Sequence, residues 1–136
     1  MTAALRGLDR AHTAYEYADH TAEQAWVRFM TPARMDSLVL SVHGRLAHPE
    51  LAEAADTATR RLGSELSDAG VVILGDLAAA LLAGGDIEQG VHVARRFAAA
   101  ADARPNTMGR ARALNVADRL PHHERELAAQ LRACAA

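Results

Sequence analysis

Helix-breaking residues divide the chain at regular intervals, and this spacing constrains the fold more than any other feature of the sequence. Prolines stand at positions 32, 49, 105 and 121, and a Gly84-Gly85 pair lies between the second and the third of them. Each proline can occupy the first turn of a helix, where its missing N–H has no intrahelical partner. Between the breakers, apolar residues recur at intervals of three and four, which is the period of a helix with one buried face.

This pattern predicts seven helices and no sheet. The expected helices begin near residues 3, 32, 49, 68, 87, 107 and 122; the first two end at 19 and about 47, and a turn or helical stub covers 22–29. Thr31, Ser67 or Asp68, Asp86, and Asn106 or Thr107 are the expected N-caps. Alanine accounts for 32 of the 136 residues, and alanine favours helix. Because the loops are very short, neighbouring helices should be antiparallel, within one domain that covers residues 1–136.

The segment 74–90 resembles a tetratricopeptide repeat. The resemblance rests on the large–small pair Leu77-Ala78, on the turn at 85–87 and on Gly90 in the second helix. Two helices cross closely where small residues face each other, so Ala78 is expected opposite Gly90. The segment 43–54 looks like a degenerate copy with Gly44 as its close-crossing glycine, and 106–134 resembles a third, capping hairpin. The copies lie near the ~34-residue period of this repeat class. The resemblance implies an all-α, right-handed solenoid of stacked antiparallel hairpins.

A second resemblance covers almost the whole chain. Its elements are Leu8-Asp9-Arg10-Ala11, Ala25-Trp26-Val27-Arg28-Phe29, a helix reaching Gly44, Gly85-Asp86-Ile87-Glu88-Gln89, and Arg110-Ala111-Arg112. This order is similar to the C-terminal array of actinobacterial transcription regulators with an N-terminal helix-turn-helix of the Xre type. The likeness implies an interaction or oligomerisation module of such a regulator. DNA contact would then belong to a domain outside this sequence, and the first helix would lack its hairpin partner.

Composition excludes several classes of function. The 15 basic residues are all Arg and the net charge is −2, so the chain lacks the basic surface that supplies most nucleic-acid affinity. No block of 18 apolar residues could span a membrane, and the N-terminal segment is too charged for a signal peptide. The single cysteine, Cys134, permits no internal disulfide and suits a reducing cytoplasm.

Catalytic and metal sites find little support in the sequence. The side chains of His122 and His123 diverge on a helix and no His-x3-His pair occurs, so this pair is interpreted as solvated helix-cap residues. His12, His43 and His92 are interpreted as isolated, packed or partly exposed helix residues. Cys134 has no nearby base, and no Gly-Lys-Ser/Thr motif follows the paired glycines. We therefore expect no enzyme activity, no metal and no cofactor.

Three sets of residues are the predicted interaction sites. A partner groove along the first helices of the hairpins would contain Ser41, Arg45, His48, Asp76, Ala79, Ala83, Arg112 and Asn115. Unpaired end helices would form a homodimer through Leu5, Leu8, Tyr15, Leu127 and Leu131. Trp26 and Phe29 would anchor a hairpin junction. Two alternative functions stay open: a small helical ligand-binding protein or enzyme with a buried pocket, and a stand-alone antagonist that pairs with a full-length regulator.

Overall fold

Five of the seven described helices begin at a residue whose side chain caps the first turn. The computed structural model describes residues 2–18, 31–62 and 67–136. Within these ranges it contains α1 (Ala3–Tyr17), α2 (Pro32–Arg45), α3 (Leu51–Leu62), α4 (Asp68–Gly84), α5 (Ile87–Ala103), α6 (Thr107–Ala117) and α7 (Arg125–Ala135), with no strand. The predicted all-α fold class and the predicted seven helices are confirmed. The stub expected at 22–29 lies outside the described residues.

Four of the predicted caps form as expected. The side chains of Thr31, Ser67, Asp86 and Asn106 each accept a hydrogen bond from the backbone N–H three residues later, at 2.7–3.3 Å. Each cap satisfies one of the N–H groups that the first turn of a helix leaves unpaired. Gly85 ends α4 in the left-handed conformation, with φ of 93°, which glycine adopts without steric cost. Local chemistry therefore fixes where most helices begin.

Four helix bounds differ from the prediction. α1 ends at Tyr17, two residues before the expected position 19, and α3 begins at Leu51, two residues after the expected Pro49. α2 ends at Arg45, before the expected Ala47, because Ala47 has a positive φ of 46° and takes the chain into a turn. α7 begins at Arg125, three residues after His122, and a turn in which the Glu124 N–H donates to the Pro121 carbonyl precedes it.

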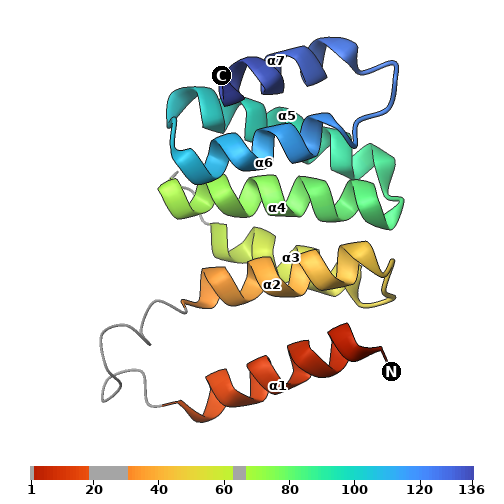
Figure 1. Cartoon of the computed structure of the whole chain (residues 1–136), viewed down its shortest axis with the longest axis vertical. Coiled ribbons are helices and arrows are strands. Elements are labelled where there is room, and N and C mark those ends of the chain that lie inside the picture. Colours follow the sequence, from red (N-terminus) through yellow and green to blue (C-terminus); the bar gives the residue numbers. More distant parts are fainter. Residues whose placement is uncertain (1, 19–30, 63–66) are drawn as a thin grey trace.

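The helices pack in consecutive pairs around α4. α2 contacts α3, α4 contacts α5, and α6 contacts α7, while the first members of these pairs, α2, α4 and α6, lie side by side with α4 in the middle (Figure 1). One hydrophobic cluster runs through α2 to α7 and includes the fully buried side chains Leu40, Leu77, Phe97 and Leu131. Among the described helices, α1 contacts α2 alone.

The glycines mark close approaches, but not the ones predicted. A Cβ atom added to Gly90 would lie 2.7 Å from the side chain of Leu82, so Leu82 and not Ala78 is the residue opposite Gly90. A Cβ atom added to Gly44 would lie 2.7 Å from Cα of Ala80. Gly44 therefore permits the close contact of α2 with α4, rather than a crossing inside its own hairpin.

Candidate functional site

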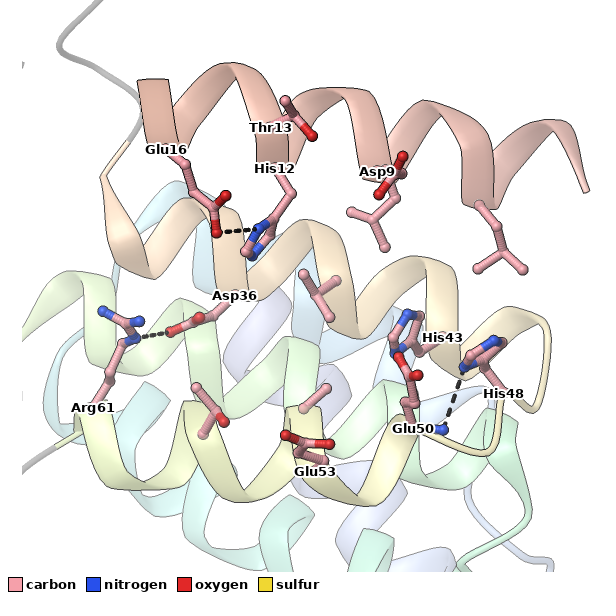
Figure 2. Close-up of a pocket in the computed structure, with 15 residues that line it drawn as sticks. Asp9, His12, Thr13, Glu16, Asp36, His43, His48, Glu50, Glu53 and Arg61 are labelled. Atoms are coloured by element: carbon pink, nitrogen blue, oxygen red, sulfur yellow. Dashed lines mark hydrogen bonds and ion pairs between the residues drawn. The ribbon is translucent and has the colours of Figure 1, made fainter. Parts of the chain in front are cut away.

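A groove of about 910 Å³ separates α1 from the hairpin formed by α2 and α3. Figure 2 shows side chains from all three helices, and from the turn that joins α2 to α3, directed into this space. The lining residues are Leu5, Leu8, Asp9, His12, Thr13, Glu16, Asp36, Val39, His43, His48, Glu50, Glu53, Ala54, Thr57 and Arg61. α1 thus forms one wall of the groove, and the hairpin forms the opposite wall.

The α1 wall is held loosely. Its N-cap is Thr2, whose hydroxyl accepts the Leu5 N–H at 3.3 Å, so the helix has a defined beginning. Leu5, Leu8 and Tyr15 share one face and are only partly buried, and no residue of α1 is buried. The apolar area that α1 removes from water is therefore small, and so is the stabilisation that its docking contributes.

Acidic groups dominate the polar lining of the groove. Five carboxylates face it, from Asp9, Glu16, Asp36, Glu50 and Glu53. Among the described residues, the lining also contains a single arginine, at position 61 in α3, and three histidines. An acidic groove attracts cationic groups and repels anions.

The arginine of the groove is already paired. The Nε atom of Arg61 lies 2.8 Å from Oδ2 of Asp36, a buried carboxylate on α2. Burial raises the pKa of Asp36, and the nearby Arg61 and His12 only partly oppose this shift. At the surface of the groove, Nδ1 of His12 lies 3.4 Å from Oε1 of Glu16, one helical turn further along α1. The remaining acids of the groove keep most of its negative charge.

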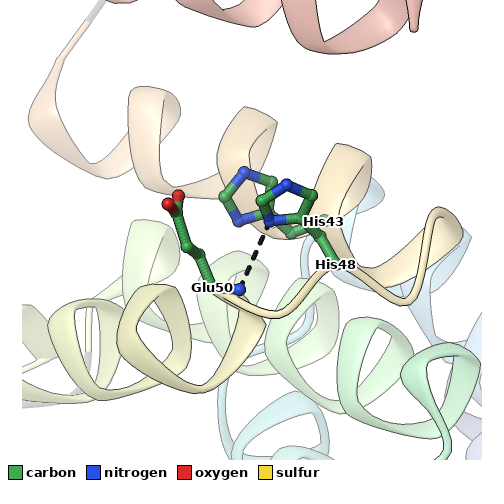
Figure 3. Close-up of side chains that lie close together, drawn as sticks. All are labelled: His43, His48 and Glu50. Carbon is green, nitrogen blue, oxygen red and sulfur yellow. Dashed lines mark hydrogen bonds between the residues drawn. The ribbon is translucent and has the colours of Figure 1, made fainter. Parts of the chain in front are cut away.

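Two histidines and a glutamate converge at the end of the groove where α2 turns into α3. The rings of His43 and His48 stack with centroids 4.5 Å apart and an interplanar angle of 27°. The Glu50 N–H donates to Nδ1 of His48 at 3.3 Å, and the Glu50 carboxylate lies beside the two imidazole rings (Figure 3). Ligating atoms of the three residues all lie within 4.8 Å of one another.

His43 is the buried member of this cluster. Its side chain is 7% exposed, and its Nδ1 atom has no hydrogen-bond partner among the residues that the structure describes. Burial and the neighbouring His48 lower the pKa of His43. His43 is a packed helix residue, as expected, but the prediction that it is isolated is wrong, because its ring stacks on that of His48. His43 and His48 are five residues apart, a spacing that does not align two side chains on one helix. They meet because the chain turns after α2, where Ala47 has a positive φ.

The predicted partner groove is a different surface. Asp76 and Arg112, on α4 and α6, form an ion pair with Oδ1 and Nε 3.1 Å apart. The first helices α2, α4 and α6 also carry four exposed residues of the predicted groove, namely Ser41, Arg45, Ala83 and Asn115. Ala79 on α4 is partly buried. His48 instead lines the groove beside α1. The two charged residues at the centre of the predicted groove thus neutralise each other.

One part of the predicted dimer surface is corrected. Leu127 is 6% exposed and Leu131 is fully buried, because both pack into the core of their own chain. α7 contacts α5 and α6, which cover its apolar face, so these leucines are not available to a second copy. Trp26 and Phe29 lie outside the described residues.

None of the described helices is long and apolar enough to cross a lipid bilayer. Comparison of the chain with protein-family models, with curated proteins and with solved structures finds no match.

Proposed function

We propose that the chain is a protein-interaction module of a transcription regulator, and that it binds a basic peptide segment of its partner in the groove between α1 and the α2–α3 hairpin. The observation that carries this proposal is the groove itself. It is about 910 Å³ in volume, open to solvent on a helical scaffold, and lined by five carboxylates. A groove between helices is a common place for ligands and peptides to bind.

The packing of the helices supports a repeat architecture of the tetratricopeptide kind. In stacked hairpins, the first helices of successive pairs lie next to one another, as α2, α4 and α6 do. The close contact of Gly44 with Ala80 lets two such first helices approach. Arrays of this kind present extended surfaces to protein partners. The assignment to a regulator rests on the resemblance of the segments around Trp26, Gly85 and Arg110 to the Xre-type family.

Charge selects the class of partner. Asp9 and Glu53 face the groove from opposite walls, and neither has an ion-pair partner among the described residues. Both are exposed, so they can meet the cationic side chains of an extended segment without prior desolvation. Complementary charge speeds the encounter and rejects partners of the wrong sign. An arginine- or lysine-bearing segment therefore fits, and an acidic one does not.

A peptide-display selection on the purified chain tests this proposal. We expect the selected peptides to be enriched in Arg and Lys, and their affinity to fall with rising salt concentration. Asp9→Asn and Glu53→Gln should each weaken binding by up to about 5-fold, since an exposed ion pair is worth up to ~1 kcal/mol. Glu88→Gln, a change of the same kind on the exposed first turn of α5, is the matched control. Selection of neutral or acidic peptides, or equal binding by all three variants, would overturn the proposal.

The homodimer stays a prediction, now confined to α1. Its remaining residues are Leu5, Leu8 and Tyr15, which are partly buried on one face of that helix. Sedimentation at micromolar concentration tests it. A dimer that Leu5→Glu with Leu8→Glu abolishes would locate the interface, whereas a 14.5 kDa species that persists on concentration excludes the dimer.

A further inference from the structure

We propose that His43, His48 and Glu50 form a binding site for a divalent transition-metal ion of the Zn²⁺ class at the end of the groove. Two imidazoles and one carboxylate are a donor set that zinc uses in proteins. Imidazole nitrogen favours zinc and its neighbours in the transition series over Mg²⁺ and Ca²⁺, which prefer oxygen ligands.

The geometry is close to what such an ion requires. Zinc binds nitrogen and oxygen at about 2.0–2.2 Å, which places the ligands of a tetrahedral site roughly 3.3 Å apart. Here the three ligating atoms lie within 4.8 Å of one another, so modest side-chain movements would bring them into range. Glu50 is exposed and His48 is only partly buried, so both are able to move, whereas His43 is held in α2.

A second observation points to a ligand independently of this convergence. Nδ1 of His43 is buried without a hydrogen-bond partner among the described residues, although buried polar atoms are nearly always paired. A metal ion bound at this nitrogen would supply the missing partner. On His48, the Nδ1 lone pair receives only a long hydrogen bond of 3.3 Å from the Glu50 N–H, which a metal can replace at little cost.

The site would keep one coordination position open. Three ligands come from the protein, and all three residues also line the groove, so a water molecule or a group of a bound partner can complete the tetrahedron. The ion would join the last turn of α2 to the turn before α3. It would also place a positive charge at one end of an otherwise acidic groove.

Titration of the metal-free, untagged full chain with ZnCl₂ by calorimetry tests the site, with Co²⁺ absorption as a probe of tetrahedral geometry. We expect one saturable ion per chain. His48→Gln and Glu50→Gln should each weaken Zn²⁺ binding by at least about 10-fold, which is the smallest loss seen even for residues that only support a ligand. Both residues lie at the surface, so these variants should keep the circular dichroism spectrum of the wild type.

Matched controls separate this site from other donors. His123→Gln removes an exposed imidazole beside Glu124, and Cys134→Ser removes the only thiol of the chain. Both variants should bind Zn²⁺ as the wild type does, and Zn²⁺ should raise the melting temperature of both. Absence of saturable binding by the wild type would overturn the proposal. So would binding that survives in His48→Gln and Glu50→Gln or is lost in either control.

Discussion

Replacing Gly44 by alanine should destabilise the fold, because this position has no room for a side chain. The added Cβ atom would lie 2.7 Å from Cα of Ala80 and 2.9 Å from both Cβ and the carbonyl oxygen of the same residue. These are mainly backbone atoms of α4, which cannot rotate away as the end of a long side chain can. Overpacking of this kind costs about 1–3 kcal/mol. The better helix propensity of alanine returns up to ~1 kcal/mol, so a net loss of up to about 2 kcal/mol is expected.

Urea unfolding followed by far-ultraviolet circular dichroism measures this loss. The same experiment on Gly7→Ala is the matched control, because a Cβ atom at Gly7 in α1 meets nothing within 4 Å. That variant should be as stable as the wild type or slightly more stable. If Gly44→Ala behaves like Gly7→Ala, then α2 and α4 do not approach as closely as described, and the argument for adjacent first helices fails.

Three further measurements test burial and charge. The folded chain holds the proton of Asp36 to higher pH than the unfolded chain, whose carboxyl keeps its ordinary pKa of 3.8. Urea unfolding should therefore show the wild type gaining stability relative to Asp36→Asn as the pH falls from about 7 towards 4. A stability difference that stays constant with pH would contradict this. Ala78→Leu should cost about 1–3 kcal/mol in thermal unfolding, because Ala78 is fully buried; unchanged stability would refute this. Leu131→Ala should cost about 2–5 kcal/mol at every protein concentration, since its cavity opens inside one chain, and a loss that depends on concentration would indicate an interface instead.

Local signals in the sequence predict the helices well. Thr31, Ser67, Asp86 and Asn106 act at their helix ends through contacts within three residues, so no knowledge of the tertiary structure is needed to recognise them. The left-handed Gly85 is predictable for the same reason. Helix class and helix number follow from these local rules.

Contacts between helices are harder to predict, because they depend on rotation about each helix axis. Leu38 shares the apolar spacing of α2 but is 41% exposed, whereas Leu40, which lies nearly on the opposite face of the helix, is fully buried. For the same reason the sequence pattern predicts Ala78 opposite Gly90, whereas the structure has Leu82 there. The three-and-four spacing identifies a helix with a buried face, but in an alanine-rich chain it does not define which face that is.

The candidate site was beyond sequence reasoning for a related reason. Its residues come from three helices and a turn, and one of its walls is α1, which contacts only α2 among the described helices. The His43–His48 pair depends on the turn at Ala47, which has a positive φ. Alanine rarely adopts this conformation, so the residue type at position 47 does not predict it. A histidine pair flanking a predicted helix end, followed by Pro49 and a glutamate, is the one signal that could have drawn attention to it.

Because α4 is central and α1 is peripheral, the two helices should open to solvent at very different free energies. Ten of its residues are buried and it contacts α2, α3, α5 and α6, whereas α1 has no buried residue. Amide hydrogens in α4 should therefore exchange with solvent deuterium only through global unfolding, and those of α1 through local opening at a much smaller free energy. α1, which forms one wall of the groove, can then leave and return many times while the rest of the chain stays folded, so the lifetime of the groove is set by the detachment of α1 rather than by the stability of the core.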